Sequence, residues 1–349
     1  APWRATRAAP DRRHPRRPSY ELPRMPLALI LLLVGVSVLI IAVMLRRALP
    51  RPVLIGLPYS HYVELARWAL QQPTADHVPR PFREIKVSVG PHLAIVGAYR
   101  ILFSGLSSTS SFPGSDTRQP WYLAPLFGFA MLRRLTGVPV FVSADGECLP
   151  DSWSILRFCG YSIDHKLAKR WDEQLGPAVR KVGYYFIFQL PGVYRGLQSC
   201  GALQMALFDA MELLFQTSRW IMKPMMGIRP EQIPAATATI RVAFADASAV
   251  LECYPYLADG NGGPDFGGAD LAFSALSGWA LQPIPQYHNG ECWLPPSELL
   301  HAHSEYRALS QELIATRAGR HVLRCYKEHR TPSTCSTDDD DTLPKIKSS

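Results

Sequence analysis

The chain lacks the cysteine pattern of a disulfide-bonded or dithiol protein. Its seven cysteines are scattered and odd in number, and no two form a Cys-x-x-Cys pair. This spacing excludes a disulfide framework and indicates a reducing compartment. Zinc-finger spacings are also missing, and basic residues are not interleaved with aromatics, so nothing favours nucleic acid as a partner. We expect no metal site, because the histidines of His301-x-His303 would point to different faces of a helix.

Long apolar runs are also lacking, with one exception near the N-terminus. Residues 26–45, PLALILLLVGVSVLIIAVML, contain no charged side chain, and Arg46 and Arg47 follow them directly. The run is long enough to cross a bilayer as a helix. A cleaved signal peptide has a shorter apolar core and a small-residue cleavage site. We therefore expect one retained transmembrane helix and a single-pass membrane protein.

The orientation in the membrane depends on where translation begins. Residues 1–25 form a basic leader, which favours a cytoplasmic N-terminus and a translocated domain. If Met25 is the start, the arginines after the apolar run favour a cytoplasmic domain instead. The leader also fits an organelle transit peptide, or disordered or untranslated sequence. The cysteine pattern favours a domain that faces a reducing compartment, either the cytosol or an organelle stroma or matrix.

A strand, a tight turn and a helix are predicted for residues 53–71. Val53, Leu54 and Ile55 form an apolar run suited to a buried strand, and glycine and proline punctuate the turn after it. Ser60 stands at the N-cap of the helix, where its hydroxyl can accept a backbone hydrogen bond. Ligands of open α/β sheets favour the edge at which such a turn lies.

A hairpin followed by a helix is predicted for residues 138–160. Residues 138–142 are apolar and β-branched, and Asp145-Gly146 is a strong turn dipeptide. Asp151 or Ser152 caps the next helix, and Gly160 ends it. Residues 82–89 alternate and predict a further strand between the two stretches. The predicted order is strand, helix, strand, a connection, then strand, strand, helix.

These two stretches resemble the two halves of the glutathione site in the glutathione transferase family. In that family the residue before a cis-proline pairs its backbone with the cysteinyl group of glutathione, and Val138-Pro139 matches. An acidic or polar residue followed by serine holds the γ-glutamyl carboxylate, and Asp151-Ser152 matches. The resemblance implies glutathione as co-substrate, with these four residues binding it.

The C-terminal half adds to the resemblance. Residues 254–257 and 267–272 resemble the capping motif ahead of a buried helix, with Asp270 holding the first turn, although Gly267 stands where the family usually has Ser or Thr. The implied fold is an α/β thioredoxin-like domain followed by an all-α helical bundle. We place the thioredoxin-like domain at 52–160, an inserted loop at 94–137, the helical domain at 165–330 and a disordered acidic tail at 331–349.

The position of the family's catalytic Ser or Cys holds Leu57, which cannot donate a hydrogen bond to a thiolate or form a mixed disulfide. Ser60 and Tyr59 are the candidate catalytic residues, because a hydroxyl near a helix N-terminus can stabilise a thiolate with help from the helix dipole. The alternative is that Ser60 only caps and Tyr59 only packs.

The resemblance predicts a protein that conjugates glutathione to a hydrophobic electrophile or reduces a peroxide, and family members usually dimerise. The alternative is a non-catalytic, membrane-tethered scaffold or docking module with the same fold. A further feature is a set of basic residues that share one helical face near the C-terminus. This face fits contact with an anionic lipid surface or an anionic substrate, or simply a solvated surface: it comprises Arg317, Arg320, Arg324, Lys327 and Arg330.

Overall fold

The computed structural model describes residues 51–57, 60–74, 78–79, 81–86, 138–189, 223, 227–282 and 301–330. The leader, the apolar run 26–45, Tyr59, the insertion 94–137 and the acidic tail lie outside these ranges. The predictions made for them therefore stay predictions. Within the described ranges, no helix has both the length and the apolar character needed to cross a membrane.

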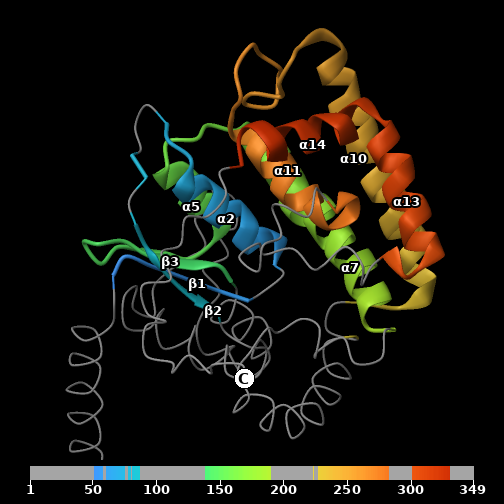
Figure 1. Cartoon of the computed structure of the whole chain (residues 1–349), viewed down its shortest axis with the longest axis horizontal. Helices are drawn as coiled ribbons and strands as arrows, with labels where there is room; N and C mark the ends of the chain where they lie inside the picture. The colour runs from blue at the N-terminus through green and yellow to red at the C-terminus, as the bar shows by residue number, and fades with distance from the viewer. Residues whose placement is uncertain are drawn as a thin grey trace, which may run out of the picture. The chain divides into compact units, whose positions relative to one another are not determined.

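A four-stranded sheet forms the N-terminal part of the described chain (Figure 1). The strands lie in the order β2–β1–β3–β4, where β1 and β2 are parallel and β3 is antiparallel to both β1 and β4. Gly146 has a φ of +86° in the hairpin between β3 and β4, a conformation that glycine adopts without steric cost. The predicted strands and hairpin turn are confirmed, with these bounds: β1 Val53–Gly56, β2 Arg83–Lys86, β3 Val140–Val142 and β4 Cys148–Leu149.

Helices α2 (His61–Gln71) and α5 (Ser152–Phe158) contact each other on one side of the sheet (Figure 1). Leu54, Phe141 and Leu149 point from the strands into the core that these helices share. Alternate strand residues point to the opposite face, where a second buried cluster consists of Val53, Ile55, Val140 and Val142.

The C-terminal part is helical. A π-helical segment, Trp171–Leu175, joins α6 to α7, and every residue of α11 is buried. Helix α11 contacts α2, α7, α13 and α14, so it lies at the centre of the core. The bounds are α6 His165–Arg170, α7 Gly176–Ile187, α10 Ile233–Cys253, α11 Gly268–Leu281, α13 Ser304–Ala315 and α14 Arg317–Glu328.

One hydrophobic core runs from the helix-bearing face of the sheet into the C-terminal helices. An apolar stripe on α10 faces this core, with Ile240, Phe244 and Leu251 buried. The residues on both sides of 160–165 contribute to the same core, and the domain boundary placed there stays a prediction.

Helix α2 is buried on its polar face as well as on its apolar face. Glu64 and Arg67 are 0 % and 1 % exposed. Arg67 Nε lies 2.6 Å from Glu84 Oε1 on β2, and Glu64 Oε1 lies 2.7 Å from Arg330 Nε, just beyond α14. Partners distant in sequence therefore allow a charged helix face to enter the interior.

Candidate functional site

Three strand ends meet at one edge of the sheet. Because β1 and β4 are both antiparallel to β3, their C-terminal ends lie beside the N-terminal end of β3. The β1–β3 ladder pairs Ile55 with Val140, so the next positions of its register place Pro139 opposite Gly56. The predicted site residues of the described chain follow or precede these ends: Ser60, Val138, Pro139, Asp151 and Ser152.

The peptide bond between Val138 and Pro139 is cis, as the resemblance implies. Val138 packs against the buried cluster of the sheet, and Pro139 is buried. The ladder between β1 and β3 ends at Val140, so the backbone groups of Val138 lie beyond it. Their contact with a ligand stays a prediction.

Asp151, not Ser152, caps α5. Its Oδ1 accepts a hydrogen bond from the Ser154 backbone N–H at 2.7 Å, and the Ser154 hydroxyl contacts the Asp151 backbone in return. This capping box fixes the first turn of the helix. Ser152 follows it, is 2 % exposed, and makes no hydrogen bond through its hydroxyl to another described residue.

Ser60 occupies the N-cap position of α2, but its side chain makes no capping hydrogen bond. The prediction that its hydroxyl accepts from the helix N–H groups is therefore wrong. The extended backbone at Ser60, with φ −88° and ψ 117°, starts the helix without that bond, and its carbonyl accepts from Glu64 N–H at 2.9 Å. The hydroxyl is thus not committed to the helix.

Leu57 follows β1 and packs against the sheet instead of occupying an exposed reactive position. Its half-buried side chain packs on the cluster formed by Val53, Ile55, Val140 and Val142. The residue at the expected nucleophile position therefore contributes apolar contacts. Any chemistry at this edge must come from other side chains or from a ligand.

The C-terminal helices contact the first turns of α2 and α5. Tyr62 donates a hydrogen bond to the Asp172 carbonyl at 3.2 Å, and Trp153 Nε1 donates to Asp172 Oδ1 at 2.9 Å. Burial raises the pKa of Asp172, and the bond from Trp153 opposes this effect. A Cβ atom at Gly176 would lie 2.2 Å from the Tyr62 hydroxyl, so glycine permits the close approach of α7 to α2.

The sequence did not indicate His61 and Arg180 as site residues. His61 is the first residue of α2 and is 2 % exposed, and its Nε2 makes no hydrogen bond of good geometry to a described residue. Burial lowers the pKa of His61 to about 3, the charge of Arg180 acts in the same direction, and the Gly176 backbone partly offsets them. Arg180 is half-buried on α7 and also affects the pKa of Asp172. No local sequence pattern could have placed these two side chains together.

Acidification should destabilise the protein through His61. Between pH 6.5 and about 3 the unfolded chain binds a proton at this histidine and the folded chain does not, so stability falls as pH falls through that window. The change in unfolding free energy from pH 7.5 to pH 4.5, measured by urea denaturation, should be smaller in His61→Gln by about 2 kcal/mol. The matched control is His165→Gln, which replaces an exposed histidine. Equal pH dependence in all three proteins would refute this role.

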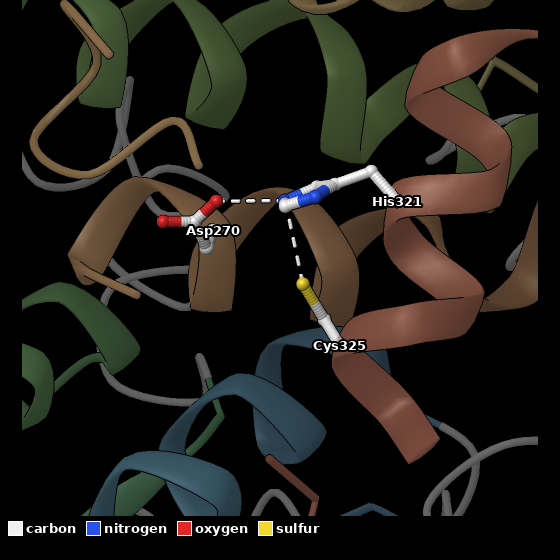
Figure 2. Close-up of side chains that lie close together, drawn as sticks. All are labelled: Asp270, His321 and Cys325. Carbon is white, nitrogen blue, oxygen red and sulfur yellow. Dashed lines mark hydrogen bonds and ion pairs between the residues drawn. The ribbon is translucent and has the colours of Figure 1, made fainter. Parts of the chain in front are cut away.

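A second polar cluster joins α11 to α14. Figure 2 shows His321 reaching from α14 between Asp270 on α11 and Cys325 one turn further along α14. His321 Nε2 lies 2.7 Å from Asp270 Oδ1 and 3.3 Å from Cys325 Sγ. All three side chains are buried, and their donor atoms lie within 4.8 Å of one another. These residue types could together ligate a metal ion.

The hydrogen bonds favour a structural role for this cluster. Arg324 Nη2 lies 3.0 Å from His321 Nδ1. Arginine can only donate, so Nδ1 accepts and Nε2 carries the ring proton toward Asp270. A metal ion would need the Nε2 lone pair that this proton occupies. The prediction of no metal for the whole chain stays a prediction.

Asp270 also holds the loop that precedes α11. Its two oxygens accept from the backbone N–H groups of Leu257, Ala258 and Gly267 at 2.7, 2.8 and 2.9 Å. The predicted role of Asp270 in holding the first turn of the buried helix is confirmed. A Cβ atom at Gly267 would lie 2.3 Å from the Ala258 carbonyl oxygen. This close approach explains why glycine stands where the resemblance implies Ser or Thr.

No protein-family model matches this chain. No curated protein matches it either. Among solved structures, Gtt2 from Saccharomyces cerevisiae is similar with a TM-score of 0.35 and 14% identity, covering 78% of this chain and 100% of its own. A glutathione S-transferase from Methylobacterium radiotolerans, in complex with glutathione sulfonate, has a TM-score of 0.33 and 15% identity, covering 78% of this chain and 93% of its own. A sphingomonad glutathione S-transferase complexed with glutathione has a TM-score of 0.33 and 13% identity. The match covers 79% of this chain and 99% of the transferase. At these values the similarity carries no functional argument.

Proposed function

We propose that this protein is glutathione-transferase-like and binds reduced glutathione at the edge of the sheet where β1, β3 and β4 end. The observation that carries the proposal is the register of the sheet, which brings the cis Val138-Pro139 step beside the turn after β1 and the Asp151-Ser152 pair after β4. These are the motifs through which the sequence resembles the family. Both motifs therefore lie at the edge where the turn after β1, a distant part of the chain, also lies.

In this proposal each part of glutathione meets a different element. The backbone of Val138 pairs with the cysteinyl unit, and Asp151 and Ser152 hold the γ-glutamyl end. The thiol then lies near Ser60 and the N-terminus of α2, an eleven-residue helix whose dipole favours a thiolate. The half-buried Arg180 adds a positive charge close to the same helix end.

The chemical step requires no nucleophile from the protein. The glutathione thiol loses its proton to solvent, and its sulfur then forms a bond to an electrophilic carbon while the leaving group departs with the bonding electrons. The contribution of Ser60 is a hydrogen bond from its hydroxyl to the thiolate, which lowers the pKa of the thiol. Leu57 cannot make this contribution, and the Ser60 hydroxyl is not occupied by a cap.

The second candidate function is a non-catalytic scaffold or docking module with the same fold. The packing of Leu57 into the sheet cluster favours it, because it leaves the expected nucleophile position without a reactive group. In both cases we propose attachment to a membrane through residues 26–45, with the folded part facing a reducing compartment. Formation of a homodimer is likewise part of the proposal.

Calorimetric titration of the full chain in detergent with reduced glutathione tests the binding proposal. Saturable binding is expected, weakened roughly tenfold or more in Asp151→Asn plus Ser152→Ala, since charge-assisted contacts would be lost. Asparagine retains the capping oxygen, so α5 should still form. The control Ser162→Ala alters an exposed serine and should bind as the unmodified chain does.

The result also separates the two candidate functions. No binding at millimolar glutathione, in protein shown by circular dichroism to be folded, would contradict the transferase proposal and leave the scaffold as the better account. If glutathione binds, conjugation to 1-chloro-2,4-dinitrobenzene can be compared between the unmodified chain and Ser60→Ala. A loss of turnover with unchanged glutathione affinity is expected for a residue that acts on the thiolate.

A further inference from the structure

A groove with three arginines lies away from the candidate glutathione site. It runs between the C-terminal end of α10, the loop that follows it and the first two turns of α14, and its volume is about 430 Å³. This size is within the range of sites for small organic ligands. Its polar walls consist of Arg317, Arg320, Arg324, His321 and Glu252, and the remaining lining includes Cys253, Tyr254 and Pro255.

The fold divides the basic face predicted from the sequence, and only part of it lines the groove. Arg330 is buried and paired with Glu64, so it does not belong to a surface. Arg317, Arg320 and Arg324 are spaced by three and four residues on α14, and all three line the groove. The fold thus gathers three of the five residues of the predicted face into a cavity, which a simple solvated helix face would not require.

Backbone carbonyl groups hold the three guanidinium groups in place. Arg317 Nη1 donates to the Leu251 carbonyl at 3.0 Å, and Arg320 donates to the Ala315 carbonyl. Arg324 donates to the Pro255 carbonyl and lies over the Tyr256 ring, with its Cζ 4.5 Å from the ring centroid. Each guanidinium has five N–H groups, so donors remain available after these bonds.

The arginines of the groove have no ion-pair partner within the described chain. Arg67, Arg170, Arg241 and Arg330 all pair with carboxylates there, whereas Arg317, Arg320 and Arg324 do not. Glu252 is the acidic side chain of the lining, set against three arginines. The groove therefore keeps an excess of positive charge that an anionic ligand can neutralise.

We propose that this groove binds a phosphate group carried by an organic molecule. The planar guanidinium fork matches the oxygens of phosphate, and several such groups around one cavity favour a doubly charged anion over a single carboxylate. The exposed ring of Tyr254 and the Pro255 ring provide an apolar wall for the organic portion. The phosphate belongs either to a soluble phosphate ester or to the headgroup of a membrane lipid, and this site is independent of the glutathione proposal.

Cys253 provides a local readout of occupancy, since it is exposed and lines the groove. The full chain in detergent is treated with a maleimide, and modification of Cys253 is followed by peptide mass mapping. Inorganic pyrophosphate should slow this modification saturably, whereas sodium chloride at equal ionic strength should not. In a parallel arm, the chain is incubated with phosphatidylcholine vesicles, with or without phosphatidylinositol 4-phosphate.

The variant Arg317→Gln plus Arg320→Gln should weaken protection by pyrophosphate roughly tenfold or more. Arg324 is left intact because it contacts His321. If the double variant does not fold, the single variant Arg320→Gln is tested in its place. The control Arg307→Gln removes the charge of an exposed arginine on α13 and should behave as the unmodified chain.

Protection by pyrophosphate supports the soluble phosphate ester. Protection only by vesicles that contain the phosphorylated lipid, and not by plain phosphatidylcholine, supports the headgroup. The proposal is overturned if neither probe protects Cys253, if sodium chloride protects it equally, or if the double variant and the Arg307 control respond alike.

Discussion

Replacing Asp270 with alanine is expected to lower the free energy of unfolding by about 3 to 5 kcal/mol. The carboxylate is fully buried and accepts hydrogen bonds from three backbone N–H groups and from His321. Alanine would leave all four donors without their partner in the interior, where desolvation is not compensated. The loss should also loosen the loop before α11, the helix at the centre of the core.

Urea denaturation followed by circular dichroism measures this effect. The matched control is Asp246→Ala, which removes an aspartate from an ion pair with Arg170 on the surface and should cost less than about 1 kcal/mol. If Asp270→Ala and Asp246→Ala destabilise the protein equally, the hydrogen bonds around Asp270 do not stabilise the fold in the way the structure indicates.

Replacing Arg330 with methionine is expected to destabilise the protein by about 3 to 5 kcal/mol, because it leaves Glu64 buried without a counter-ion. Arg330 Nε lies 2.7 Å from Glu64 Oε1, and its Nη1 lies 2.5 Å from Gln71 Oε1. Both partners lie on α2, so the chain just beyond α14 is fixed to the helix that covers the sheet. The guanidinium also lies 5.8 Å from the ring centroid of Trp68 on the same helix.

A double-mutant cycle tests the pair. Glu64→Gln combined with Arg330→Met should recover much of the stability lost in Arg330→Met, since no isolated charge remains in the interior. The same cycle at Arg241 and Glu312, whose side chains are about half exposed, should give a coupling below about 1 kcal/mol. A coupling at Glu64 and Arg330 no larger than that of the exposed pair would contradict the structural account.

Much of the local structure could be predicted because short-range physics determines it. A short apolar run gives β1, which ends at Gly56, and Asp145-Gly146 gives the hairpin between β3 and β4. Asp151 caps α5 with its own side chain, a bond that spans three residues. The resemblance also identified the role of Asp270 in holding the first turn of α11.

The errors came from partners that are far apart in the sequence. Glu64 is charged and fully buried, and its partner, Arg330, lies 266 positions later in the chain. Arg330 seemed to extend a basic surface for the same reason. Ser60 has the residue type and position of a cap, yet the backbone starts α2 without its hydroxyl.

The sequence by itself determined the strands, turns and capped helices of this protein, together with the motifs on which the glutathione proposal depends. These features follow from backbone preferences and from side chains a few residues apart. Only the tertiary structure decided which charged groups are buried, and that the charge of Arg180 on α7 acts on His61 at the start of α2. It also decided that three arginines share a groove with the end of α10. The reason is physical: the burial and charge environment of a side chain depend on every element packed around it, and most of those elements are distant in the sequence.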